Sequence, residues 1–145
     1  MGQGMGWRCT ECGAGEDFML GCGGLSFNRD VDREAVKNGL FGIAAKILIE
    51  SDDDIYTISH SVYYVCEECG GYTQGSALSI SSMEDRKPIW ALYCPEVCSV
   101  CGKEDTLCGD EPVSDKELHD RIRTFVMDGC PLCGGPVQED FVCWD

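Results

Sequence analysis

The sequence is poor in basic residues and in long apolar runs, and both shortages exclude classes of function. Only 11 of its 145 residues are lysine or arginine, against 26 aspartates and glutamates, so the formal net charge is −15. Binding of nucleic acid by bulk electrostatics needs clustered lysine and arginine, and we therefore do not expect it. No stretch approaches the roughly 18 consecutive apolar residues of a membrane span, so we expect no membrane partner.

Histidine is also scarce, and the two present, His60 and His119, lie far apart in the chain. A zinc hydrolase with an open metal site would place two histidines at helical spacing, a pattern that this sequence lacks. The glycine-rich segment 20–24 has no lysine of a phosphate-binding loop. We therefore expect a protein that is not an enzyme.

Cysteine, by contrast, is abundant, with 12 in the chain. Eight of them form four Cys-x-x-Cys pairs, each followed by glycine: Cys9/Cys12, Cys66/Cys69, Cys98/Cys101 and Cys130/Cys133. The first residues show neither the basic nor the apolar region of a secretory signal, so we expect a cytoplasmic location. Thiols stay reduced there, and paired cysteines favour metal over disulfides.

Two Cys-x-x-Cys turns can bring four thiolates to the corners of a tetrahedron, the arrangement of a structural zinc site. The order of the pairs predicts two Zn²⁺ per chain, one bound by Cys9, Cys12, Cys66 and Cys69 and the other by Cys98, Cys101, Cys130 and Cys133. Tetrahedral sulfur sites also accept iron, which remains the alternative metal. The sequence leaves open whether Cys22, Cys94, Cys108 or Cys143 are ligands.

The pattern of apolar residues predicts an α+β fold built from short antiparallel strands. Residues 28–51 have apolar positions at helical spacing, which predicts one helix or two, bent near Gly39 or Gly42. Ser114 and Glu117 form a capping box ahead of a helix predicted over residues 115–127, with Leu118, Ile122, Phe125 and Val126 as its buried stripe. Strands are predicted at residues 17–20, 55–65, 72–83, 88–93 and 137–144.

Segments 9–23, 64–71 and 130–135 carry a resemblance to small uncharacterised bacterial zinc-ribbon proteins. This resemblance implies two zinc-ribbon units, residues 1–90 with the helical insert at about 28–51 and residues 91–145 with the C-terminal helix. The pairs Cys98/Cys101 and Cys130/Cys133 are also similar to rubredoxin, which implies an iron electron carrier as an alternative. The helix predicted at 115–127 replaces the turn-rich aromatic segment of rubredoxin, so we prefer zinc.

These observations predict a zinc-binding, non-catalytic, acidic module that binds a macromolecular partner, preferably a protein with a basic surface. The residues between the paired cysteines would be presented at the tips of the four turns: Thr10/Glu11, Glu67/Glu68, Ser99/Val100 and Pro131/Leu132. These tips contain no lysine or arginine, which argues against direct nucleic-acid binding. A mimic of nucleic acid that inhibits a DNA- or RNA-binding protein is a further alternative. The sequence does not define an oligomeric state.

Overall fold

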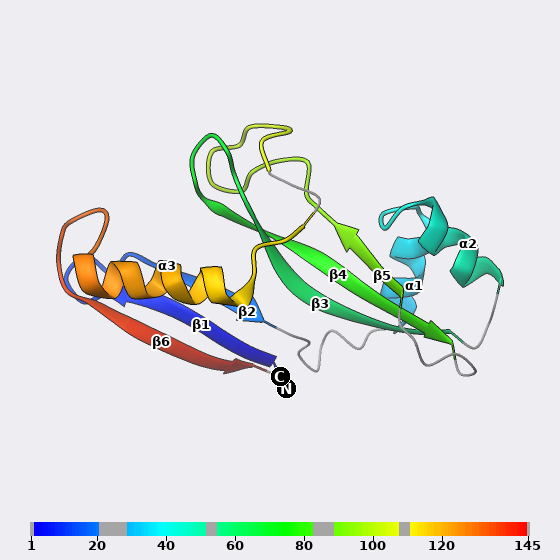
Figure 1. Ribbon diagram of the computed structural model, residues 1–145, viewed down its shortest axis with the longest axis horizontal. Helices are drawn as coiled ribbons and strands as arrows, with labels where there is room; N and C mark the ends of the chain where they lie inside the picture. The colour runs from blue at the N-terminus through cyan, green and yellow to red at the C-terminus, as the bar shows by residue number, and fades with distance from the viewer. Residues whose placement is uncertain (1, 21–28, 52–54, 83–88, 108–110, 145) are drawn as a thin grey trace.

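The computed structural model describes residues 2–20, 29–51, 55–82, 89–107 and 111–144. In these residues it contains two three-stranded antiparallel sheets, the first with one helix across a face and the second with two short helices at one end, and two loop regions that carry the paired cysteines (Figure 1). The expected α+β class is therefore confirmed. No described helix is long and apolar enough to cross a membrane.

The first sheet has the strand order β2-β1-β6 and joins the two ends of the chain. Its central strand β1 (Gly2–Cys9) pairs with β2 (Gly15–Leu20) on one side and with β6 (Val137–Trp144) on the other. Helix α3 (Asp115–Asp128) lies across one face of this sheet (Figure 1). Alternate residues of β1 face the helix, and the core comprises Met5, Trp7, Cys9, Phe18, Leu118 and Ile122 together with Tyr63, Cys130 and Val137.

Helix α3 begins and ends where its sequence signals predict. The Ser114 side chain accepts a hydrogen bond from the Glu117 amide, and the Glu117 carboxylate accepts one from the Ser114 amide, so the capping box is formed. Gly129 stops the helix with a positive φ of 93°. Leu118 and Ile122 are buried as expected, whereas Val126 lies outside the buried stripe with 38% of its surface exposed.

The second sheet has the order β3-β4-β5 and is covered at one end by two short helices. Strands β3 (Ile55–Val65) and β4 (Tyr72–Ser82) pair along their whole length, and β5 (Ile89–Tyr93) adds to β4. The expected helical insert consists of two helices, α1 (Arg29–Lys37) and α2 (Ile43–Ser51), and the break between them contains Gly39 and Gly42 with φ of 85° and 90°. Their core consists of Val36, Ala45, Ile49, Ile55, Leu78 and Ile80.

Tyr63 on β3 connects the two sheets. Its ring contacts Phe18 of β2 edge to face at 5.1 Å, and its hydroxyl accepts a hydrogen bond of 2.7 Å from the Met19 amide. The Tyr63 carbonyl accepts a further bond of 2.7 Å from the Val113 amide, just ahead of α3. The aromatic cluster and the backbone bonds at this residue thus hold β3 against the first sheet.

The strands are not grouped as the expected units 1–90 and 91–145 would group them. Strand β6, from the end of the chain, lies beside β1, while β5 completes the sheet formed by β3 and β4. The entropic cost of closing a loop rises only with the logarithm of its length. Strand pairing and metal binding can therefore offset the cost of bringing distant segments together. The order of the strands in the sequence therefore does not show which strands share a sheet.

An ion pair between Arg121 of α3 and Glu16 of β2 fastens the helix to the first sheet. Arg121 donates two hydrogen bonds to the Glu16 carboxylate, at 2.9 and 2.8 Å, and the Trp7 indole donates a third at 2.8 Å. The guanidinium also lies over the Tyr72 ring, 4.4 Å from its centroid. Burial raises the pKa of Glu16, but the bonds from Arg121 and Trp7 outweigh it and hold that pKa below its usual value.

We expect Arg121→Ala to lower the free energy of unfolding by about 1–2 kcal/mol, discounted for the partial exposure of the pair. The matched control is Arg8→Ala, which removes a more exposed ion pair with Asp17 and should cost less than about 0.5 kcal/mol. Urea unfolding of the metal-loaded protein measures both. Because the pKa of Glu16 is lowered in the fold, its contribution is present at neutral pH and fades as the pH falls through that value. Equal losses for the two arginines would contradict this role.

Candidate metal centres

The first cluster joins the start and the end of the chain. Cys9 is the last residue of β1, Cys12 follows in the turn to β2, and Cys130 and Cys133 lie between α3 and β6. The sulfur atoms of these four residues all lie within 4.8 Å of one another. The sulfur atoms of Cys9 and Cys133 are 3.5 Å apart, and those of Cys12 and Cys130 are 3.6 Å apart.

The second cluster lies at the other end of β3 and β4 from the helices α1 and α2. Cys66 and Cys69 occupy the turn between β3 and β4, and Cys98 and Cys101 lie in the segment that follows β5. These four sulfur atoms also lie within 4.8 Å of one another, with Cys66 to Cys101 at 3.8 Å and Cys69 to Cys98 at 3.7 Å.

The four turns share one backbone geometry, and the glycine after each second cysteine explains it. In each turn this glycine donates its amide to the carbonyl of the first cysteine, as Gly134 does to Cys130 at 2.8 Å. Each of these glycines has a positive φ between 69° and 75°: Gly13, Gly70, Gly102 and Gly134. Side chains with a Cβ rarely adopt this conformation, so the repeated Cys-x-x-Cys-Gly pattern is a backbone requirement of the turn.

All eight predicted ligands lie in the two clusters, but their expected pairing is corrected. The sequence order grouped Cys9 and Cys12 with Cys66 and Cys69, and Cys98 and Cys101 with Cys130 and Cys133. The structure instead groups Cys9, Cys12, Cys130 and Cys133 in one cluster and Cys66, Cys69, Cys98 and Cys101 in the other.

The cause of this pairing is the antiparallel register of β1 with β6. Cys9 is paired with Val137, and the Thr10 amide donates to the Pro136 carbonyl at 3.0 Å, which places the last turn beside the first. The amphipathic segment 137–144 was recognised as a strand, but the glycine-rich segment 2–9 was not. A strand predicted at residues 2–9 would have identified β1 as a candidate partner for β6, and with it the correct grouping of the cysteines.

Of the four remaining cysteines, Cys94 alone has a side chain that the structure describes. Cys94 is partly buried and lies outside both clusters, which supports the preference for Cys98 and Cys101. Cys22 and Cys108 lie outside the residues that the structure describes. Cys143 belongs to β6, where its backbone is paired with Gln3.

The arrangement of the sulfur atoms fits a tetrahedral metal ion. A regular tetrahedron with metal–sulfur distances of about 2.3 Å has edges of about 3.8 Å, close to the observed sulfur separations. Backbone amides also point at the sulfurs, as the Leu132 amide does at Cys130 (3.4 Å) and the Gly135 amide at Cys133 (3.3 Å). Four thiolates would fill the coordination sphere of zinc, which is the pattern of a structural site. Either zinc or iron satisfies this geometry.

Hydroxyl groups add a second layer of contacts at the second cluster. Thr106 Oγ1 lies 3.1 Å from the Cys66 sulfur, and Thr73 Oγ1 lies 3.8 Å from the Cys98 sulfur. Thr73 also accepts a hydrogen bond from the Ser99 amide at 3.0 Å, so β4 is tied to the turn that carries Cys98. Such outer contacts orient metal ligands and stabilise the thiolate form.

The surroundings divide the thiols of each cluster into acidic and weakly acidic ones. The Cys12 amide is the main cause that lowers the pKa of Cys9 to about 7, and the Cys101 amide is the main cause that lowers the pKa of Cys98 to about 6. The Gly135 amide lowers the pKa of Cys133, but neighbouring thiols outweigh it and raise that pKa to about 12. The Gly71 amide lowers the pKa of Cys69, but burial and the neighbouring thiols outweigh it and raise that pKa to about 11. Each cluster therefore holds protons at neutral pH until a metal displaces them.

Comparison with protein-family models, with curated proteins and with solved structures finds no match to this chain. The expected resemblance is thus supported only at the level of the sites: two four-cysteine clusters consistent with zinc-ribbon-like metal centres.

Double substitutions test the pairing of the ligands. We expect Cys12→Ser with Cys133→Ser to remove one site, leaving about one metal per chain, because both residues belong to the first cluster. Cys12→Ser with Cys69→Ser should damage both sites and leave almost no tightly bound metal. Elemental analysis after dialysis measures the difference. The opposite ranking of the two variants would support the pairing that sequence order suggests.

Metal binding should release protons at neutral pH. Because Cys133 and Cys69 have raised pKa values, at least one thiol per cluster is protonated at pH 7 and must lose its proton to bind metal. Addition of zinc to the metal-free protein in weak buffer with a pH indicator should therefore acidify the solution, and apparent affinity should fall as the pH is lowered. Zinc binding without proton release at pH 7 would contradict this.

Proposed function

We propose that this protein is a zinc-binding, non-catalytic, acidic interaction module whose two metal ions hold the fold and whose surface binds a protein partner. The observation that carries the proposal is the convergence of two sets of four cysteine sulfurs. A zinc ion bound by four thiolates keeps no open position for a substrate, so such sites stabilise folds. We place the protein in the cytoplasm, where its thiols stay reduced.

The exposed turn tips support a role in binding. All eight tip residues are exposed, and Val100 and Leu132 expose 62% and 80% of their surfaces: the tips are Thr10/Glu11, Glu67/Glu68, Ser99/Val100 and Pro131/Leu132. A chain with a net charge of −15 attracts basic surfaces and repels nucleic acid. A basic protein is therefore the partner that this surface favours.

The first test is elemental analysis with an absorption spectrum of protein purified without added metal. We expect about two zinc ions per chain and no visible absorption band, because zinc thiolates are colourless. Iron with thiolate-to-iron bands would overturn the zinc assignment and make electron transfer the working function.

The interaction itself is tested with the zinc-loaded protein immobilised on a support. A captured partner should be identified, purified and bound directly, with an affinity that weakens as salt rises because charge contributes to the contact. Binding that persists unchanged after the zinc is removed by a chelator would argue that the metal-held fold does not present the binding surface.

A further inference from the structure

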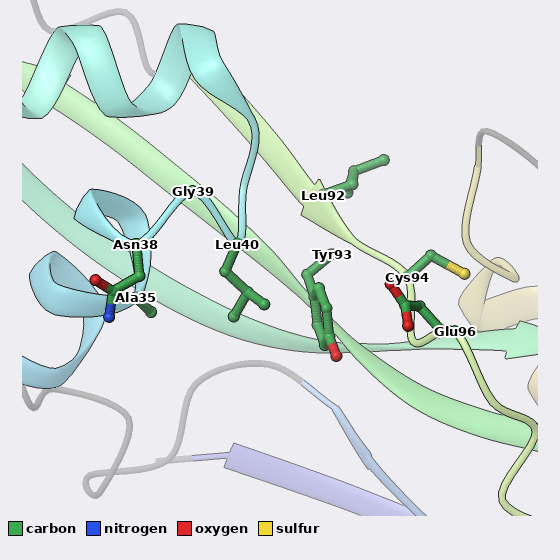
Figure 2. A pocket seen from close by; sticks show the side chains of 8 residues that line it. All are labelled: Ala35, Asn38, Gly39, Leu40, Leu92, Tyr93, Cys94 and Glu96. Carbon is green, nitrogen blue, oxygen red and sulfur yellow. The ribbon is translucent and has the colours of Figure 1, made fainter.

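A groove lies between the α1–α2 connection and the end of strand β5. Its volume is about 720 Å³, and its lining includes Leu40 from the connection, Leu92 and Tyr93 from β5, and Cys94 and Glu96 beyond the strand. In Figure 2 the Leu40 and Tyr93 side chains lie next to one another, with Ala35 and Asn38 on one side of them and Cys94 and Glu96 on the other. The groove thus runs alongside the end of a strand and has an apolar part and an acidic end.

Strand β5 is an edge of its sheet and carries no charged residue. Its five residues read Ile-Trp-Ala-Leu-Tyr, and Ile89, Trp90 and Leu92 expose 52%, 55% and 40% of their surfaces. One side of its backbone pairs with β4, and no described strand pairs with the other side. Edge strands are normally protected by charged side chains, by proline or by a covering segment, because their free amides and carbonyls can pair with another chain.

Both edge strands of the first sheet have charged side chains, and β3, the other edge of the second sheet, is partly covered. Strand β2 carries Glu16 and Asp17, and β6 carries Glu139 and Asp140. On β3 the Tyr63 carbonyl is already occupied by the Val113 amide. Strand β5 therefore stands out as the edge whose exposed side chains favour contact with another chain.

Charge at the groove selects the chemistry of the partner. Among the described residues that line the groove, Glu96 alone is charged. Its carbonyl accepts a hydrogen bond of 3.0 Å from the amide of the acidic residue Asp105. The cation in this segment, Lys103, is bound by Glu68 at 2.8 Å. A lysine or arginine of a partner would meet Glu96 without competition from a lining cation.

We propose that β5 binds an extended segment of a partner protein, which adds to the sheet as a further strand, places an apolar side chain between Leu40 and Tyr93, and directs a lysine or arginine toward Glu96. This inference rests on the proposed interaction function and defines where and what the module binds. Backbone pairing would supply affinity, and the groove with its acidic end would supply specificity. A second copy of the chain is disfavoured as the occupant because each copy carries a net charge of −15.

The test is selection of short random peptides displayed on phage against the immobilised zinc-loaded protein. Enriched peptides should alternate apolar and polar residues and contain lysine or arginine. The strongest peptide, synthesised with capped ends, should bind Leu92→Lys and Glu96→Lys about tenfold more weakly than the original protein. N-methylation of alternate amides in the peptide should abolish binding for one of the two alternations, since only one set faces β5.

Matched controls separate the groove from the rest of the surface. Met127→Lys places a lysine at an exposed apolar position of α3, and Glu139→Lys makes the same charge reversal on β6; both should leave peptide affinity unchanged. A peptide whose basic residue is replaced by glutamate should regain affinity for Glu96→Lys. Zinc content of every variant, measured in parallel, shows that the fold is retained.

Each contrary outcome identifies what has failed. No enrichment, or peptides that bind the groove variants and the original protein equally, would overturn the proposed edge site. A captured partner that binds Leu92→Lys as tightly as the original chain would leave the interaction module standing and this inference wrong. A concentration-dependent dimer that Leu92→Lys abolishes would assign the edge to a second copy. Absence of bound zinc would instead overturn the proposed function itself.

Discussion

The four cysteine sulfurs of the first cluster make the contact on which the rest of the fold depends. They join residues that are 118 and 124 positions apart, and they fix the central strand β1 beside β6, which supports α3. A metal ion bound by these four sulfurs would tie the two ends of the chain together and stabilise the pairing of β1 with β6. A structural zinc site contributes about 10 kcal/mol or more in apparent terms, comparable with the whole stability of a small domain.

The second cluster works over a shorter range and has a different task. It joins sulfurs 29 and 35 positions apart and closes the free end of the long β3–β4 pair, where Thr73 and Thr106 contact its sulfurs. The opposite end of that pair is closed by the apolar core beneath α1 and α2. One sheet thus ends in a four-cysteine cluster on one side and in a hydrophobic core on the other, and Tyr63 links it to the sheet that carries the first cluster.

Local features of this chain could be predicted from sequence, and long-range pairing could not. The eight ligands, the capping box of α3 and the break near Gly39 and Gly42 each depend on residues a few positions apart. The grouping of the ligands depends on which strand lies beside β1, and glycine at alternate positions of segment 2–9 hides its strand character. Four equivalent Cys-x-x-Cys turns contain no information that distinguishes one pairing from another.

Metal anchoring and acidity together explain how an uncharged edge strand can remain exposed. Because zinc rather than a large core would hold this fold, strand β5 need not be buried for stability. An apolar edge would ordinarily invite pairing between copies, but a charge of −15 on each chain opposes their approach. The same charge favours a basic partner over a second copy. The net charge of the chain would then decide which segments can pair with β5, in place of the charged side chains that protect the edge strands β2 and β6.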